Sequence, residues 1–227
     1  GKGAQARSAG SRGGAFPKKR MKPTICAALV CCGLLPVPIM AQCVVPFVSP
    51  ADRLMLFHDG RFTEVDARPP QRMQAMSDGV FFVDHRGQLG HYTTEATGTN
   101  VVAQHADEVQ ASGHRIAWRV ADTLWTLRGS GSKLLSTGVS RFRVSDSLVV
   151  FVDSIAQELI VNWRGQRIPL AKVAHGSAGP QWTQGANTVS FFNQSQRSIS
   201  YFEHGVVRVL AADTDVGIVL NGNGIVG

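Results

Sequence analysis

One pattern recurs five times between Leu54 and the C-terminus, and it constrains the fold more than any other feature of the chain. Each copy has small or polar residues that lead into an apolar strand opened by a β-branched residue. The opening residues, spaced by 36, 33, 40 and 36 positions, are Val80, Ile116, Val149, Val189 and Ile225. A period of about 20 to 50 residues is typical of solenoids, propellers and arrays.

A second register of glycines runs between these strands. Each glycine is followed five positions later by an aliphatic residue. These glycines are Gly60, Gly129, Gly165 and Gly205, with Gly98 a poorer match. Glycine lets the chain reverse where φ is positive, as a tight β-hairpin requires. Because two registers agree, the pattern indicates a structural repeat.

The apolar residues of each repeat predict strands rather than helices. They come in runs of about four to six residues, rich in Val, Ile, Phe and Trp and bounded by Gly, Asp, Asn and Ser. In the best-filled repeat we expect strands near 80–83, 89–93, 100–103 and 108–111. A unit of about four antiparallel strands in this length has the size of one β-propeller blade.

Residues 54–227 resemble the β-propeller superfamily in layout. Their repeat has small polar residues, a V-x-F-x-D strand, an aromatic strand and an x-G turn, and it is similar to degenerate propeller repeats of exported bacterial proteins. The GH and WD dipeptides, the sialidase Asp box, the paired kelch glycines and the YWTD tetrapeptide are missing, so no family's active site is transferred. The resemblance implies an all-β propeller of about five repeats of 33–40 residues.

The C-terminal residues add an expectation about how the propeller ends. Asn223 to Gly227 reproduce the opening of a repeat strand, and the sequence stops three residues into it. Closure of a propeller usually needs a complete terminal strand. We therefore expect an incomplete ring, truncated at its C-terminus, rather than a closed ring of five blades.

The N-terminal region predicts export from the cytoplasm of a bacterial cell. Met21 and Lys22 open a short basic segment, an apolar stretch follows, and a small-residue cleavage site precedes Gln42. An uncleaved membrane anchor is the alternative, but Pro36 and Pro38 interrupt the apolar stretch. We expect a periplasmic, cell-surface or extracellular protein with no stable membrane span after cleavage.

The chain is thereby divided into four parts. They are a spurious or disordered basic leader at 1–20, a signal peptide at 21–41, a mature N-terminal segment at 42–53 and the propeller repeats at 54–227.

The formal net charge of +7 belongs to the part of the chain before Gln42. Seven of the 23 Lys and Arg residues precede Gln42, whereas all 16 Asp and Glu residues follow it, so 16 basic and 16 acidic residues remain in the mature part. No basic stripe is left to neutralise phosphates. The sequence therefore predicts that nucleic acid is not a partner.

No motif in the sequence carries a recognisable chemistry. The seven histidines are scattered, without H-x-x-x-H or H-E-x-x-H spacing. We predict no metal site, no cofactor and no catalytic residue.

Polar residues that follow the first strand of four successive repeats form the one candidate ligand face. Equivalent positions of stacked blades lie at equivalent heights, so we expect these side chains at one end of the propeller. The candidate residues are Asp84, His85, Arg86, Asp122, Asp153 and Asn193. Asp and Asn also favour turns for purely structural reasons.

Two functions are compatible with these features. The first is an exported, non-enzymatic propeller that acts as a binding or scaffold module for a protein or a glycan, because repeat folds offer broad surfaces. The alternative is a fragment of a propeller-fold glycoside hydrolase or lyase, which requires two carboxyl groups at a defined separation.

Overall fold

The computed structural model describes residues 44–95, 98–129, 131–174 and 180–213, and these residues form five antiparallel β-sheets. The predicted leader, the predicted signal peptide and the repeat expected to open at Ile225 lie outside the described residues. The all-β fold predicted from the sequence is confirmed. In the described part, every sheet consists of consecutive strands, so no sheet joins the two ends of the chain into a closed ring.

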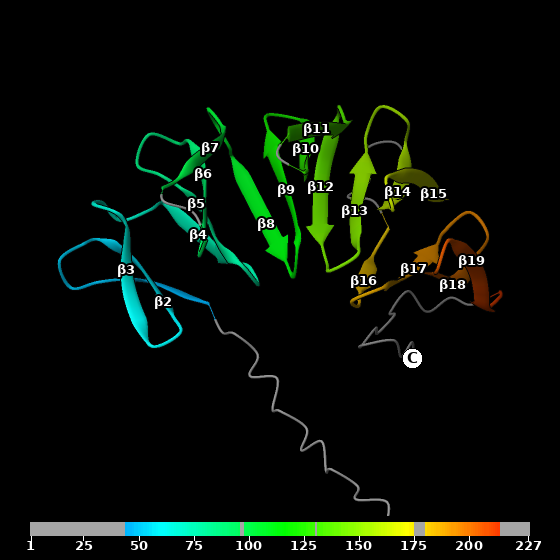
Figure 1. The fold of residues 1–227 in the computed structure, drawn as a ribbon. Helices are drawn as coiled ribbons and strands as arrows, with labels where there is room; N and C mark the ends of the chain where they lie inside the picture. The colour runs from blue at the N-terminus through cyan, green and yellow to red at the C-terminus, as the bar shows by residue number, and fades with distance from the viewer. Residues whose placement is uncertain (1–43, 96–97, 130, 175–179, 214–227) are drawn as a thin grey trace, which may run out of the picture. The chain divides into compact units, whose positions relative to one another are not determined.

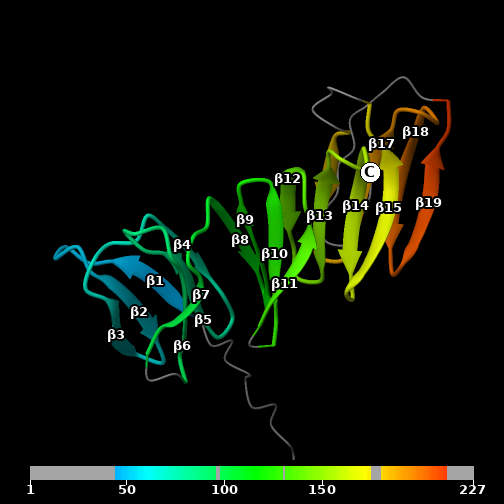
Figure 2. The same cartoon turned by 90° about the horizontal axis from the view of Figure 1, so that it is seen from above.

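Four of the sheets have four strands and the first has three (Figures 1 and 2). Sheet 1 contains β1 Val45–Val48, β2 Leu54–His58 and β3 Arg61–Asp66. Sheet 2 contains β4 Arg72–Ala75, β5 Gly79–Val83, β6 Leu89–Thr93 and β7 Asn100–Ala103. Sheet 3 contains β8 Glu108–Ser112, β9 Arg115–Val120, β10 Thr123–Arg128 and β11 Gly131–Ser136. Sheet 4 contains β12 Val139–Val144, β13 Leu148–Asp153, β14 Glu158–Trp163 and β15 Gln166–Lys172. Sheet 5 contains β16 Trp182–Gln184, β17 Thr188–Asn193, β18 Ser198–Glu203 and β19 Val206–Ala211.

The predicted strand positions are confirmed, but the sheets begin one strand earlier than the predicted repeats. The strand expected near 108–111 is β8, the first strand of sheet 3, and sheet 2 begins instead with β4. In addition, β1 lies in the segment that the sequence leaves outside the repeats. The sequence did not reveal which strand begins each sheet, because the first strands β4 and β8 are half-exposed and have weak apolar patterns.

A separate apolar cluster lies between each pair of consecutive sheets. For example, Leu54 and Leu56 of sheet 1 pack with Val80 and Phe82 of sheet 2. The second strand of a sheet contributes to the clusters on both of its faces, which is why every residue of β5 and of β13 is buried. Such face-to-face packing of twisted sheets buries apolar side chains from both partners.

A β-bulge recurs in the fourth strand of the four-stranded sheets and in β3 of sheet 1, and it explains the second sequence register. In each case one aliphatic residue is left without a partner in the ladder. These residues are Val65, Val102, Leu135, Leu170 and Leu210. The first four pack into the cluster shared with the following sheet. Sheets 2 and 3 depart from the register by one residue: Gly98 points to Ala103 and Gly129 to Leu134, whereas Val102 and Leu135 form the bulges.

Three of the glycine turns share one backbone geometry. Both central residues of each turn have positive φ, and the turns are Asp59-Gly60, Arg164-Gly165 and His204-Gly205. This is the type I′ geometry, whose twist matches that of the flanking strands. Glycine at the second central position adopts positive φ without steric strain, because it has no Cβ.

Candidate functional site

The two ends of each four-stranded sheet differ. The turn between the second and third strands lies at one end, which we call the hairpin end, because consecutive strands are antiparallel. The other two turns lie together at the opposite end, the paired-turn end. Hydrogen bonds join the paired-turn ends of neighbouring sheets: the Ser77 amide donates to the Gly113 carbonyl at 3.3 Å, and Ser112 Oγ donates to Asp146 Oδ1 at 2.6 Å. Ser147 Oγ donates to the Ala186 carbonyl at 3.1 Å. The same end of sheets 2 to 5 therefore lies side by side.

All six residues of the predicted ligand face lie at the hairpin end. Asp84, His85 and Arg86 follow β5, Asp122 follows β9, and β13 and β17 end in the other two residues, Asp153 and Asn193. Within the described part of the chain, no hydrogen bond or ion pair joins the side chains of any two of the six. The six residues lie at the same end of their sheets, as expected from the repeat. Their role in binding stays a prediction.

The side chains of Asp84 and Asn193 stabilise their own turns. Asp84 Oδ1 accepts hydrogen bonds from the backbone amides of Arg86 and Gln88, both at 2.8 Å. Asn193 Oδ1 accepts one from Ser195 Oγ at 2.8 Å. Asp and Asn are favoured in turns because they can make such local bonds.

Asp153 also links two sheets. Its Oδ1 accepts from the amides of Ile155 and Ala156, and its Oδ2 accepts from Ser136 Oγ of β11 at 2.7 Å and from the Arg167 guanidinium at 2.9 Å. Burial acts to raise the pKa of this carboxyl group, but the four hydrogen bonds outweigh it, and the pKa lies below its ordinary value.

We expect Asp153→Asn to lower the free energy of unfolding at pH 7 by about 1 to 3 kcal/mol, since it removes hydrogen bonds to a charged group. The lowered pKa of the folded state means that the carboxylate contributes fully above its unfolded pKa of about 3.9. The contribution is lost as pH falls through the folded pKa. Denaturant unfolding should therefore give a difference between variant and wild type that shrinks towards acid pH; a constant difference would contradict this account.

A cavity of about 300 Å³ between sheets 3 and 4 is the strongest candidate for a binding site. We call it the basic pocket. It lies at the paired-turn end and is lined by Arg115 of β9, Lys133 of β11 and Arg164 of the β14–β15 turn. Lys133 Nζ is 3.9 Å from the point that a Cβ on Gly165 would occupy, so it lies beside the Arg164-Gly165 turn.

The basic residues of this pocket have no acidic partner in the described part of the chain. None of Arg115, Lys133 and Arg164 forms an ion pair with another described residue. Asp146, the acidic residue that lines the pocket, accepts a hydrogen bond from Ser112 instead. Burial lowers the pKa of the half-buried Arg115 guanidinium. A partly desolvated cation without a counterion is unfavourable, and an anion bound in the pocket would compensate it.

The hairpin turn and a neighbouring ring fix the position of Arg164. Its φ is +51°, in the left-handed region that side chains other than Asn, Asp and His rarely adopt. The equivalent residues of sheets 1 and 5 are Asp59 and His204. Ala121, Gln157 and Arg197 adopt the same left-handed geometry in other turns, so it belongs to the turns rather than to the pocket. The guanidinium lies over the Trp163 ring, 4.6 Å from its centroid, which orients the side chain.

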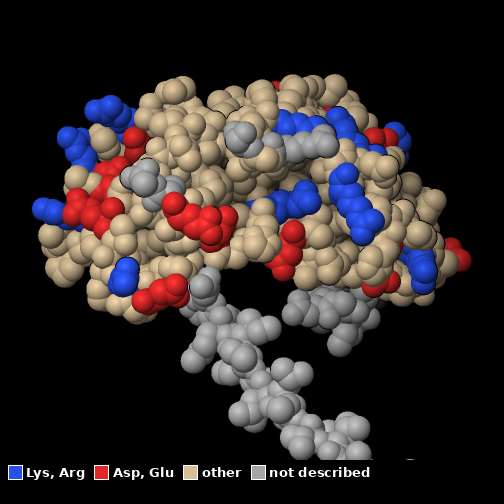
Figure 3. All heavy atoms as spheres, viewed as in Figure 1, with Lys and Arg blue, Asp and Glu red and all other residues tan. Residues whose placement is uncertain are grey.

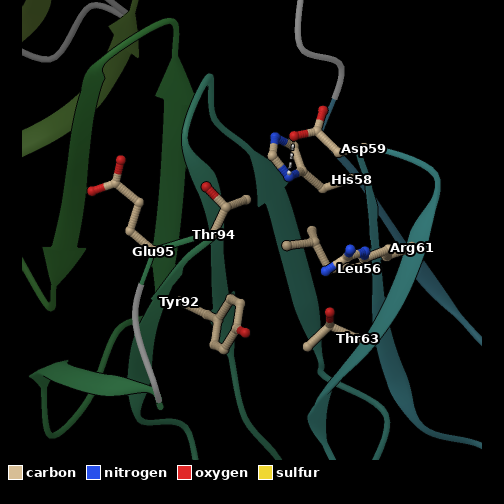
Figure 4. A pocket seen from close by; sticks show the side chains of 8 residues that line it. All are labelled: Leu56, His58, Asp59, Arg61, Thr63, Tyr92, Thr94 and Glu95. Atoms are coloured by element: carbon tan, nitrogen blue, oxygen red, sulfur yellow. Dashed lines mark ion pairs between the residues drawn. The ribbon is translucent and has the colours of Figure 1, made fainter.

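A second cavity, of about 600 Å³, lies between sheets 1 and 2 (Figure 4). Its wall includes His58 and Asp59, whose side chains approach within 3.6 Å, and Arg61 from β3. Tyr92 and Glu95 line it from sheet 2. Figure 4 shows Asp59 and Glu95 on opposite sides of the pocket.

The sequence did not indicate the basic pocket. Its basic residues come from three chain segments and form no motif, although the glycine register does mark the Arg164-Gly165 turn. That turn and the one before Arg115 lie at the same end of their sheets because of strand alternation alone. The pocket could therefore be found only once the structure showed which strand begins each sheet.

The described residues contain no group of three or more His, Cys, Asp and Glu residues placed to hold a metal ion. None of the described segments forms a helix with the length and apolar character needed to cross a membrane. On the face drawn in Figure 3, basic and acidic side chains lie interspersed over a largely uncharged surface.

The consecutive four-stranded antiparallel sheets define the chain as a β-propeller. A family model described as the 10-bladed beta propeller domain matches residues 39–223. The chain belongs to this family. A search of curated proteins finds no match.

Solved structures with a similar fold are distant in sequence. Hsv2 from Kluyveromyces lactis is 12% identical with a TM-score of 0.48, and the match covers 80% of this chain and 64% of that one. Human WBSCR16 is 6% identical with a TM-score of 0.47, covering 78% of this chain and 67% of that one. The N-terminal domain of Nup159 is 12% identical with a TM-score of 0.44, covering 74% and 57%. The chain thus spans about two thirds or less of the length of these proteins.

Proposed function

We propose that this chain is an exported, non-enzymatic β-propeller that binds a protein or a glycan through an acidic group of that partner. The observation that carries the proposal is the basic pocket, where Arg115, Lys133 and Arg164 line one cavity without an ion-pair partner in the described chain. Arginine recognises carboxylate and phosphate groups with its planar set of donors.

Export is supported by the sequence of residues 21–41, which has the basic, apolar and small-residue segments of a signal peptide. The proposed site of action is the periplasm, the cell surface or the medium of a bacterium. An N-terminus at Gln42, found by mass spectrometry of the exported protein, would support this; a product that retains Met21 would support a membrane anchor.

Binding can be measured by calorimetric titration with two acidic probes, an oligogalacturonate for the glycan class and an aspartate-rich peptide for the protein class. We expect one of them to bind, and a neutral oligoglucoside not to bind. Arg115→Gln and Arg164→Gln should each weaken binding by about 10- to 100-fold, since each removes a charge-assisted hydrogen bond.

The matched control is Arg86→Gln at the hairpin end, which should leave the affinity unchanged. Equal binding of neutral and acidic probes, or loss of binding in Arg86→Gln alone, would contradict the proposal. The second outcome would instead favour the ligand face predicted from the sequence.

The alternative function is that of a glycoside hydrolase or lyase fragment. It is favoured by Asp59 and Glu95, two carboxyl groups that line one cavity from different sheets, because most glycosidases use such a pair. Release of product from a glycoside by this chain, abolished in both Asp59→Asn and Glu95→Gln, would replace the binding proposal.

A further inference from the structure

A buried amide lies in the wall of the basic pocket. Asn162 of β14 lines the cavity and is 3% exposed. Its side chain forms no hydrogen bond with another described residue. An amide that is buried without a partner destabilises the folded chain. A ligand in the pocket would supply the missing partner.

The packing of the sheets does not explain an amide at this position. Asn162 pairs with Val149, the residue that opens the apolar run of β13. In sheets 2 and 5 the corresponding pair is completed by Tyr92 and Phe202. Both have a large ring, and Phe202 is fully buried in the cluster between sheets 4 and 5. An apolar or aromatic side chain therefore suits this position, and the amide is particular to the pocket.

Hydrogen-bond acceptors accompany the basic residues of this pocket. Thr126 Oγ1 lines the cavity and donates its proton to the Ile116 carbonyl at 2.6 Å, so towards any other group it can only accept. The Asp146 carboxylate lines the cavity too, and it accepts only. Asn162 has an acceptor oxygen besides its two donor hydrogens. A ligand matches this lining if it brings donors as well as negative charge.

A simple anion has no such donors. Sulfate, or the carboxylate of an acidic protein side chain, can accept from Arg115 and Lys133 but gives no hydrogen to Thr126, and the Asp146 charge repels it. A peptide has further donors only if its backbone enters the cavity together with the carboxylate. The volume of about 300 Å³ lies at the lower end of the range of small-molecule sites, roughly 300 to 1,000 Å³, which favours a small, compact group.

A hexuronic acid carries both kinds of group on one ring. Its carboxylate matches the arginines, and each of its hydroxyl groups both donates and accepts. Leu127 and Leu135 also line the pocket and offer apolar surface to the C–H groups of the ring.

We infer that the acidic group bound in the basic pocket is a hexuronic acid residue of a glycan, with its carboxylate at the basic residues and its hydroxyl groups at Asn162 and Thr126. This inference rests on the proposed function, since it specifies the ligand of the same pocket.

Calorimetric titration of this chain with four probes tests the inference. The probes are oligogalacturonate, oligomannuronate, an aspartate-rich peptide and sodium sulfate. We expect one of the hexuronates to bind at least about 10-fold more tightly than the peptide or sulfate. Asn162→Leu and Asn162→Ala should both weaken hexuronate binding by about 10- to 100-fold, because both remove the amide. The alanine variant does so without filling the cavity, which separates a lost hydrogen bond from a steric block.

Both variants should remain folded, since the equivalent positions of sheets 2 and 5 hold no amide. Circular dichroism checks this. Asn100→Leu is the matched control, because Asn100 is exposed on β7, outside the pocket, and its replacement should leave the affinity unchanged.

Two outcomes would overturn the inference and leave the proposed function standing. One is a peptide or sulfate that binds as tightly as either hexuronate, and the other is an Asn162→Ala variant that binds hexuronate as tightly as wild type. If none of the acidic probes binds, the inference and the proposed function both fail.

Discussion

Phe151→Ala should lower the free energy of unfolding by about 3 to 5 kcal/mol, and Phe191→Ala should do the same. The two rings hold equivalent positions in β13 and β17, and both are 0% exposed. Phe151 lies in the cluster between sheets 3 and 4, and Phe191 in the cluster between sheets 4 and 5. Each truncation leaves a cavity between two sheets that cannot close without moving their backbones. Denaturant unfolding at pH 7 measures the loss.

Leu134→Ala is the control for both substitutions. Leu134 lies on β11 and is 46% exposed, so its truncation should cost less than about 1 kcal/mol. A loss of similar size in Phe151→Ala would mean that this ring does not hold sheets 3 and 4 together.

Gly79→Ala should destabilise the chain by about 3 kcal/mol or more, because the added methyl group meets backbone rather than a movable side chain. A Cβ at Gly79 would clash with the carbonyl oxygen of Tyr92 and would lie 2.8 Å from Thr93 Cα. Both atoms belong to β6, so the methyl group can fit only if β5 and β6 separate. The stability measurement is the same denaturant titration.

Gly98→Ala is the matched control for this substitution. A Cβ at Gly98 meets no atom within 4 Å, and no positive φ constrains the position. The change should stay within about 0.5 kcal/mol of wild type or stabilise slightly, since alanine reduces the freedom of the unfolded chain. Equal effects at Gly79 and Gly98 would contradict the close approach of β5 and β6.

The strands could be predicted from the sequence because burial on both faces leaves a strong apolar pattern. Phe151 and Phe191, at equivalent positions of two repeats, are both fully buried. The first strand of each sheet could not be predicted, because a strand such as β8 carries Glu108 and Gln110 and is only partly buried. The sequence also cannot show that Leu135 rather than Leu134 forms the bulge, because the two differ only in pairing.

The candidate site was hidden for a related reason. Asp84 and Asp153 recur at fixed places in the repeat and were visible as a pattern, and in the structure they stabilise turns. Arg115, Lys133 and Arg164 come from different positions of two sheets and share no period. Residues that recur in every repeat are those that stabilise each sheet. The residues of the basic pocket occur in only one pair of sheets, so the repeat does not reveal them.

Hydrogen–deuterium exchange of this chain, with and without the acidic probe that binds it, tests binding at the basic pocket most directly. If the partner binds at the paired-turn end, exchange should slow at the backbone amides of residues 113–115 and 163–166. It should be unchanged at 84–88 and 153–157, at the hairpin end. Slower exchange confined to the hairpin-end segments would contradict the account and would place binding on the face that contains Asp84 and Asp153.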